Sequence, residues 1–313
     1  MKTMKTMKTV RKLFGAMLVF LLLAGVAGTV PAEAASLIRS TLNYDAYLEP
    51  ADEEFYGNYH IYTGYQTGFL LREGTDGTVT IASQSGRPVS GVANDTTVLY
   101  SLYKKNVLTI WKANIKTLKK TKVAAISIKA KEARLCGFYN NVVYYSAVSK
   151  KGAHLMFSYP LSTKVSKKMG SGVTPCAQVS RYLVYNREKL DGSEGAILKS
   201  YDVRTKKGVT IDSAAETVTR LGKYIYYSKY GQNVYVVAGT LQTLPAIQIL
   251  KYNLDTNKAE MLVSIDREAY QTFRVTSKGA YLYTQTDDQI SYFYVDYATG
   301  SIREASPAEI SGV

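Results

Sequence analysis

The side chains best suited to binding a ligand fall in segments that we expect to be loops on one face of the protein. The longest of these segments runs from Lys229 to Pro245. Tyrosine, lysine and arginine around a concave opening suit a polar, anionic or carbohydrate ligand, because they combine aromatic faces with positive charge. The residues predicted to bind the ligand are Tyr65, Tyr103, Lys104, Arg187, Tyr230, Gln232, Asn233 and Tyr235.

Residues that could catalyse a reaction or hold a metal are few. The chain has only two histidines and two cysteines, which excludes His-rich metal sites and four-cysteine zinc sites. Neither His60 nor His154 has a serine or cysteine nucleophile motif beside it, and no Gly-x-Ser-x-Gly motif or Gly-rich phosphate loop occurs after residue 35. We therefore predict no catalytic residue, no metal and no cofactor.

Tight acidic clusters occur in two places, at residues 52–54 and at Asp287-Asp288. Two carboxylates are the minimum for glycoside hydrolysis, but neighbouring residues of a strand or turn point apart. An enzyme would therefore need acids from several parts of the fold to converge, for instance Glu53 and Glu216 with Arg274. A hydrolase or lyase that acts on extracellular polysaccharide through such axial carboxylates is the alternative to a binding protein.

A repeat organises the chain that must position these side chains. An apolar run ends in tyrosine followed by Ser, Thr or Asn six times, with steps of 38, 45, 40, 42 and 56 residues between the tyrosines. Each unit has room for four short strands, and no helical periodicity follows Ser36. We therefore predict an all-β fold, a six-bladed β-propeller of four-stranded antiparallel blades over residues 52–305, with 306–313 as a tail. The six tyrosines are Tyr62, Tyr100, Tyr145, Tyr185, Tyr227 and Tyr283.

A second motif predicts a turn inside most units. Asn114, Asp202, Asn253 and Asp296 are each followed by threonine three residues later. The Asn or Asp side chain accepts hydrogen bonds from nearby backbone N–H groups and so favours a turn. Strand-like runs flank these motifs, which indicates a hairpin between two strands of each unit.

On these tyrosine and Asn/Asp-x-x-Thr motifs, the segment from Asp52 to Ala305 resembles six-bladed propellers of the YWTD and TolB-like type. It looks most similar to uncharacterised secreted propellers of Gram-positive bacteria. The chain departs from the YWTD pattern, because no unit has tryptophan at that position and no acidic residue follows the Ser or Thr. The resemblance therefore implies an architecture, and a shared fold does not carry a function.

Cys136 and Cys176 are predicted to occupy equivalent sites in adjacent blades. Each stands nine residues before its unit's tyrosine, Tyr145 or Tyr185, on the innermost strand. Equivalent sites of neighbouring blades come close near the axis, so a disulfide could form in an exported protein if the Cα atoms lie within about 7 Å. Two buried thiols are the other alternative.

The first residues predict export. A basic start is followed by an apolar run from Leu13 to Val30 and by Ala32 and Ala34, a pattern typical of a secretory signal peptide over residues 1–34. An uncleaved membrane anchor is the alternative, because the apolar run is nearly long enough to cross a bilayer. We expect no transmembrane segment after cleavage, a leader or latch strand at residues 35–51, and a secreted or cell-wall-associated protein.

The net charge of the chain indicates which kinds of partner it could bind. The whole chain has 39 Lys and Arg against 25 Asp and Glu, a net charge of +14. Outside a cell, positive charge meets anionic polymers, lipid headgroups and acidic glycans. No basic cluster stands on a helix, so we expect no nucleic acid. The sequence thus favours a non-catalytic binding or scaffold module of the cell envelope, with a glycan, an anionic wall polymer or a protein as partner.

Overall fold

The computed structural model describes residues 40–42, 55–63, 68–85, 89–189, 191–237, 239–267, 270–285, 289–306 and 309. The predicted signal peptide lies outside these residues, and so does most of residues 35–51. The described residues all belong to one unit, Leu37–Val313. No described helix is both long enough and apolar enough to span a bilayer.

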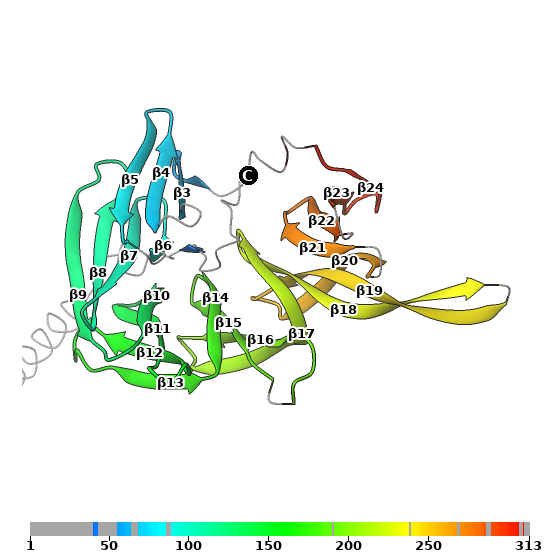
Figure 1. The fold of residues 1–313 in the computed structure, drawn as a ribbon. Coiled ribbons are helices and arrows are strands. Elements are labelled where there is room, and N and C mark those ends of the chain that lie inside the picture. The colour runs from blue at the N-terminus through cyan, green and yellow to red at the C-terminus, as the bar shows by residue number, and fades with distance from the viewer. Residues whose placement is uncertain are drawn as a thin grey trace, which may run out of the picture. The chain divides into compact units, whose positions relative to one another are not determined.

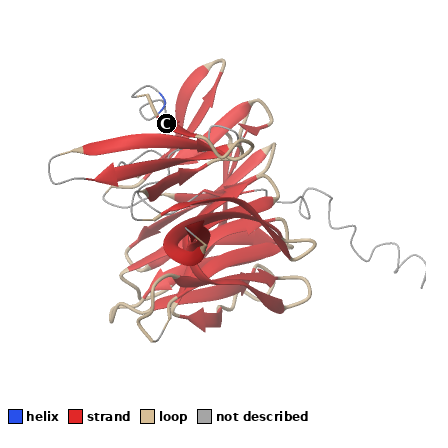
Figure 2. Cartoon of the chain, turned by 90° about the vertical axis from the view of Figure 1, so that its right-hand side faces the viewer, coloured by secondary structure: helices blue, strands red, loops and turns tan. Residues whose placement is uncertain are grey.

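The described chain is almost entirely β-strand (Figure 2). Its strands form six antiparallel blades of four strands each, which confirms the predicted six-bladed β-propeller (Figure 1). In chain order the first three blades comprise β2 (Phe55–Tyr56), β3 (Tyr59–Thr63), β4 (Phe69–Gly74) and β5 (Gly77–Ser83); β6 (Ser90–Ala93), β7 (Thr97–Lys104), β8 (Val107–Asn114) and β9 (Lys120–Ser127); and β10 (Glu132–Tyr139), β11 (Val142–Val148), β12 (His154–Pro160) and β13 (Lys167–Ser171).

The fourth and fifth blades share one long strand. This strand, β17 (Lys207–Leu221), pairs with the fourth blade through residues 207–215 and with the fifth through residues 215–221. The two blades therefore form one seven-stranded sheet. The remaining strands are β14 (Val173–Val179), β15 (Tyr182–Arg187) and β16 (Ala196–Asp202) in blade four; β18 (Tyr224–Val237), β19 (Thr240–Asn253) and β20 (Lys258–Asp266) in blade five; and β21 (Gln271–Val275), β22 (Gly279–Gln285), β23 (Ile290–Asp296) and β24 (Ile302–Glu304) in blade six.

The sequence motifs occupy the same place in every blade. Each of the six repeated tyrosines lies in the second strand of its blade, and Tyr100, Tyr145 and Tyr227 are buried there. The predicted Asn/Asp turns lie between third and fourth strands. The Asp296 Oδ1 atom, for example, accepts hydrogen bonds from the backbone N–H groups of Ala298 and Thr299, both at 2.9 Å.

Buried apolar clusters join each blade to the next along the chain. Leu135 and Tyr145 of blade three pack with Leu108 and Ile110 of blade two, and all four are almost completely buried. Further clusters lie between blades one and two, three and four, four and five, and five and six. A single blade cannot bury both faces of its sheet, so the fold depends on these contacts between blades.

The described part of the leader contributes a strand to blade two. This strand, β1 (Ser40–Leu42), pairs antiparallel with β6, the innermost strand of blade two. It also lies beside β14, the innermost strand of blade four. In addition, the Arg220 guanidinium of β17 donates a buried hydrogen bond of 3.3 Å to the Tyr56 hydroxyl of β2. Protein atoms therefore occupy the centre of the ring at these points.

Of the predicted tail, the structure describes Ser306 and Glu309. The Glu309 carboxylate forms an ion pair of 2.6 Å with Arg303 of β24 and accepts a hydrogen bond from the backbone N–H of Ser306. These bonds lower the pKa of Glu309 to about 2. The start of the tail is therefore attached to blade six.

Candidate functional site

Side chains from four different segments of the chain converge on one face of the propeller. Because successive strands of a blade are antiparallel, the loops between second and third strands lie on the same face as the connections between blades. We call this the loop face. On it, five side chains from blades four and five and from the connection to blade six form what we call the loop-face cluster: Lys189, Glu194, Glu216, Tyr230 and Arg267.

Strand pairing brings the two carboxylates of the cluster together. Ala196 of β16 pairs with Ala215 of β17, so Glu194, in the loop just before β16, lies near Glu216 of β17. Gly195 makes the close approach feasible: its φ is +72°, and a Cβ atom there would stand 2.8 Å from the backbone of Ala214. It would also stand 3.0 Å from the Glu216 Oε1 atom. A larger residue at Gly195 would push the loop away from β17.

Arg267 connects the loop of blade four to blade five. Its two terminal nitrogens donate to the two carboxylate oxygens of Glu194, both at 3.0 Å. This bidentate geometry fixes the relative orientation of the guanidinium and carboxylate planes. The guanidinium carbon lies 3.5 Å from the centre of the Tyr230 ring. The backbone N–H of Arg267 donates to the carbonyl of Pro245, which holds the segment against the base of the β18–β19 hairpin.

The remaining contacts stiffen the loop of blade four. The Lys189 ammonium donates a hydrogen bond to the carbonyl oxygen of Glu194. The Asp191 carboxylate accepts from the backbone N–H of Ser193 at 3.0 Å and from its hydroxyl at 2.7 Å. The loop therefore presents Glu194 on a structure held at both ends.

The two carboxylates differ in their electrostatics. The hydrogen bonds from Arg267 lower the pKa of Glu194. Loss of hydration, followed by repulsion from Glu194, raises the pKa of Glu216. Loss of hydration also raises the pKa of Tyr230. Arg267 thus favours the ionised form of Glu194, whereas Glu216 is more easily protonated.

The β18–β19 hairpin extends beyond the rest of its blade (Figure 1). From Gly231 to Pro245 its two strands pair with each other, while β17 pairs with β18 only as far as Lys229 and β20 pairs with β19 only from Ala246. The Asn233 amide oxygen accepts a hydrogen bond of 2.5 Å from Ser264, and its nitrogen donates to Tyr235. The structure thus places Tyr230, Gln232, Asn233 and Tyr235 along one strand that starts at the loop-face cluster.

The other predicted ligand-binding residues do not join the loop-face cluster. Tyr103 was expected in a loop, but it lies in β7 with its ring buried, and its hydroxyl donates to the carbonyls of Ile128 and Ala130 at 3.0 and 2.9 Å. Tyr103 therefore packs in the core between blades two and three. Lys104 and Arg187 are exposed at the ends of β7 and β15. Tyr65 lies outside the described residues.

The prediction missed Glu194 and Arg267, which form the strongest contact of the site. They are 73 residues apart in the chain. The only sequence signal was the length of the loop between the second and third strands of blade four. Glu216 had been considered with Glu53 and Arg274 for an axial site. Glu53 lies outside the described residues, and the Arg274 guanidinium lies 5.9 Å from the Tyr281 ring centre.

Both cysteines are free thiols, so the predicted disulfide alternative does not hold in this structure. Cys136 and Cys176 do occupy equivalent sites, because each is the extra residue of a β-bulge on an innermost strand. Cys136 packs in the cluster between blades three and four, whereas Cys176 packs in the one between blades four and five. The sheet of blade four therefore separates the two thiols.

We expect thiol titration to reproduce this arrangement. Unfolded, unreduced protein should show two free thiols, and native protein should protect Cys136, because burial raises the pKa of its thiol and removes it from solvent. Ellman's reagent measures both states, and the variant Cys136→Ser assigns the protected thiol. Finding no thiol in the unfolded, unreduced protein would show that a disulfide forms after all.

No family model matches the chain, and no curated protein matches it at a significant level. Solved structures do match. An oligogalacturonate lyase in complex with manganese has a TM-score of 0.51 at 10% identity, over 85% of this chain and 78% of that one. An oligogalacturonate lyase from Vibrio parahaemolyticus has a TM-score of 0.49 at 10% sequence identity, and the match covers 86% of this chain and 79% of that one. TolB from Acinetobacter baumannii has a TM-score of 0.41 at 14% sequence identity, and the match covers 91% of this chain and 69% of that one. At these identities the likeness concerns the fold alone, and it supports the β-propeller architecture of the chain.

Proposed function

We propose that this protein is a non-catalytic binding module of the cell envelope, and that its loop face binds a glycan. The observation that carries the proposal is the convergence of Glu194, Glu216, Tyr230 and Arg267 from four separate segments of the chain onto one face. The centre of the ring, where an axial active site would lie, holds β1 and the Tyr56–Arg220 contact instead.

The chemistry of the cluster suits a polyhydroxyl ligand. Carboxylates accept hydrogen bonds from hydroxyl groups, and guanidinium and ammonium groups donate hydrogen bonds to hydroxyl oxygens. Carboxylate and guanidinium groups side by side can therefore bind neighbouring hydroxyls of one ligand. The charges within the cluster largely compensate one another, because Arg267 already pairs with Glu194. A ligand with many hydroxyls and little charge therefore fits better than a strongly anionic one. The envelope location rests on the predicted signal peptide.

The test is a glycan array followed by titration calorimetry with the glycan retained best. We expect Glu216→Gln to weaken binding by about ten-fold, since a hydrogen bond to a charged group contributes about 1.5 kcal/mol or more. The matched control is Glu188→Gln, an exposed glutamate in the loop that carries Glu194, which is not one of the five residues of the cluster. Retention of no glycan by the wild type, or equal loss in both variants, would contradict the proposal.

The alternative is a hydrolase or lyase acting on extracellular polysaccharide. It is favoured by the proximity of two carboxylates of unlike pKa, Glu194 and Glu216, which is a feature of acid and base pairs. Such an enzyme would work at the loop face and not at the axis. Among the described residues, no three His, Cys, Asp or Glu side chains gather as a metal site requires. Release of shortened oligosaccharides from the retained glycan, abolished by Glu216→Gln, would establish this alternative.

A further inference from the structure

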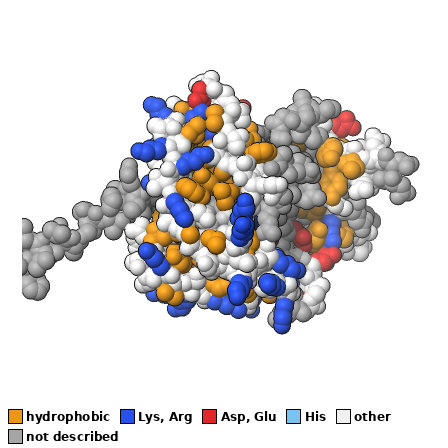
Figure 3. Space-filling model, turned by 60° about the vertical axis from the view of Figure 1, so that its left-hand side comes forward, with side chains coloured by type: hydrophobic (Ala, Val, Ile, Leu, Met, Phe, Trp, Pro, Cys, Tyr) orange, Lys and Arg blue, Asp and Glu red, His pale blue; other side chains and the backbone are white. Residues whose placement is uncertain are grey.

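The outer edges of blades two and three carry an unusual density of positive charge. Each edge consists of the turn after the third strand and the fourth strand itself, residues 115–127 and 161–171. These two segments contain seven lysines and no acidic residue, and all seven side chains are exposed. We call this surface the basic rim, formed by Lys116, Lys119, Lys120, Lys122, Lys164, Lys167 and Lys168. Figure 3 shows this side of the molecule with many Lys and Arg side chains and few acidic ones.

The basic rim is not a general feature of the outer strands. Lysines on exposed sheet edges can serve to prevent edge-to-edge aggregation, and in that role every outer strand would need them. The outer strand of blade one, β5, has no charged residue, and β20 of blade five combines Lys258 with Glu260 and Asp266. The corresponding edge of blade four has Arg204, Lys206 and Lys207 but also Asp212, so basic edges without any acidic residue are found on blades two and three. This distribution calls for a reason specific to this surface.

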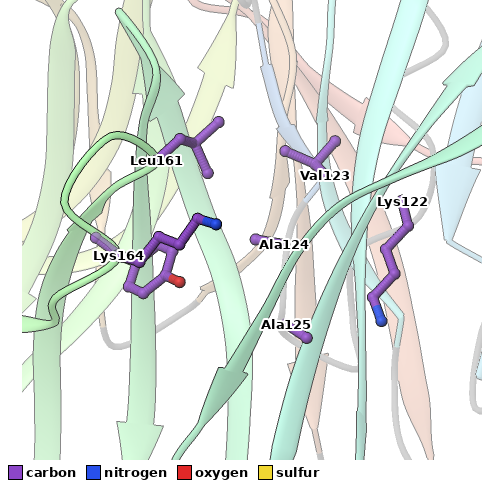
Figure 4. Close-up of a pocket in the computed structure, with 7 residues that line it drawn as sticks. Lys122, Val123, Ala124, Ala125, Leu161 and Lys164 are labelled. Carbon is purple, nitrogen blue, oxygen red and sulfur yellow. The ribbon is translucent and has the colours of Figure 1, made fainter.

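A pocket opens within the basic rim, between the two blades. It has a volume of about 330 Å³ and lies between β9 and the turn that follows β12. The small side chains of Ala124 and Ala125 leave this space open, and Val123 and Leu161 face it from opposite sides (Figure 4). Tyr159 also lines it, and Lys122 and Lys164 flank it. The pocket thus combines apolar walls with a lysine on each blade.

We propose that the basic rim binds a linear polyanionic glycan, with anionic groups along the lysines and a sugar ring in the pocket between β9 and β12. The ammonium group of lysine is a point charge on a flexible side chain. Lysines can therefore bind repeated anionic groups whose positions are not fixed. The apolar walls and Tyr159 offer a contact for the ring between two anionic groups. This surface belongs to other blades than the loop-face cluster, so the inference goes beyond the proposed function.

The experiment measures binding of dextran sulfate, which has sugar rings and anionic groups, to the full-length protein at several salt concentrations. We expect the triple variant Lys120→Glu, Lys122→Glu, Lys167→Glu to weaken binding at least ten-fold and to flatten its dependence on salt. The matched control reverses three exposed lysines of the loop face, Lys105→Glu, Lys150→Glu and Lys151→Glu, and should weaken binding by less than three-fold. Equal weakening by both triples would show attraction by net charge only and would overturn the proposal.

Two further probes identify what the pocket recognises. Ala124→Leu fills the pocket and should weaken binding of dextran sulfate several-fold, while binding of polyphosphate, which has no sugar ring, stays unchanged. Stronger binding to vesicles of anionic lipid than to either polymer would instead make the rim a membrane contact and overturn the proposal. Glu216→Gln should leave binding of dextran sulfate unchanged, so failure of the loop-face proposal and failure of this one are distinguishable. Thermal unfolding and sedimentation confirm that each variant is folded and unaggregated.

Discussion

Replacement of Gln178 by alanine is expected to lower the free energy of unfolding by about 3 kcal/mol, because it leaves buried backbone groups without hydrogen bonds. Gln178 lies in β14 and is completely buried. Its amide oxygen accepts from the backbone N–H of Phe138, and its nitrogen donates to the carbonyls of Phe138 and Ser180, all at 2.8 Å. One side chain therefore satisfies both backbone groups of Phe138 in the neighbouring blade, as a paired strand would.

Glycine at position 137 permits this contact, since a Cβ atom there would stand 3.0 Å from the Gln178 amide oxygen and 2.6 Å from Leu183. Urea denaturation measures the effect as a lower midpoint at an unchanged slope. Gln178→Leu keeps the volume but makes no hydrogen bond, so it should be nearly as damaging. The control is Gln242→Ala on the exposed hairpin. If Gln178→Leu were as stable as the wild type, the hydrogen bonds between the blades would not be the cause.

Replacement of Asp212 by alanine should also cost about 3 kcal/mol, because it leaves a buried hydroxyl and a half-buried ammonium group without their partner. Asp212 lies in β17 near the point where the strand passes from blade four to blade five. Its Oδ2 atom accepts from the Tyr227 hydroxyl at 3.2 Å and from the Lys229 ammonium at 3.0 Å. Its Oδ1 atom accepts from the backbone N–H of Ala214 at 3.0 Å.

The effect of pH follows from the same contacts. Burial, followed by the Asp212 carboxylate, raises the pKa of Tyr227 above its ordinary value of 10.0. The folded state therefore favours the neutral tyrosine. Its contribution is present below pH 10 and is lost as the pH rises further.

Urea denaturation at neutral pH tests the Asp212 prediction. The control is Asp255→Ala, a substitution of an exposed residue in a turn. Asp212→Asn should fall between the wild type and Asp212→Ala, since the amide oxygen can still accept hydrogen bonds but loses the charge that pairs with Lys229. A cost for Asp212→Ala no larger than that of Asp255→Ala would show that this network does not hold β17 in place.

The architecture was predictable because its signals are local. A tyrosine-ended apolar run marks the second strand of each blade, and an Asn or Asp side chain closes the turn that follows the third strand. The continuous β17 was not predictable, because nothing in residues 207–221 distinguishes one long strand from two. The place of β1 was not predictable either, since pairing with β6 depends on contacts between distant segments.

The site was only partly predictable for the same reason. The length of one segment singled out Tyr230, Gln232, Asn233 and Tyr235, and of these four Tyr230 lies in the loop-face cluster. Arg267 and Glu194 meet only after two blades have folded against each other, so their residue types alone carried no signal. Tyr103 was misplaced because a tyrosine near a strand end can point either into the core or into solvent, and its hydroxyl here finds two backbone carbonyls inside.

Hydrogen–deuterium exchange, with and without the glycan retained best on the array, most directly tests whether the ligand binds at the loop face. Binding at the loop face should slow exchange in peptides covering residues 188–195, 212–217, 230–236 and 264–271. Peptides covering the innermost strands β2, β6 and β14 should exchange at the same rate in both states. Protection confined to those innermost strands would place the ligand at the axis and contradict binding at the loop face.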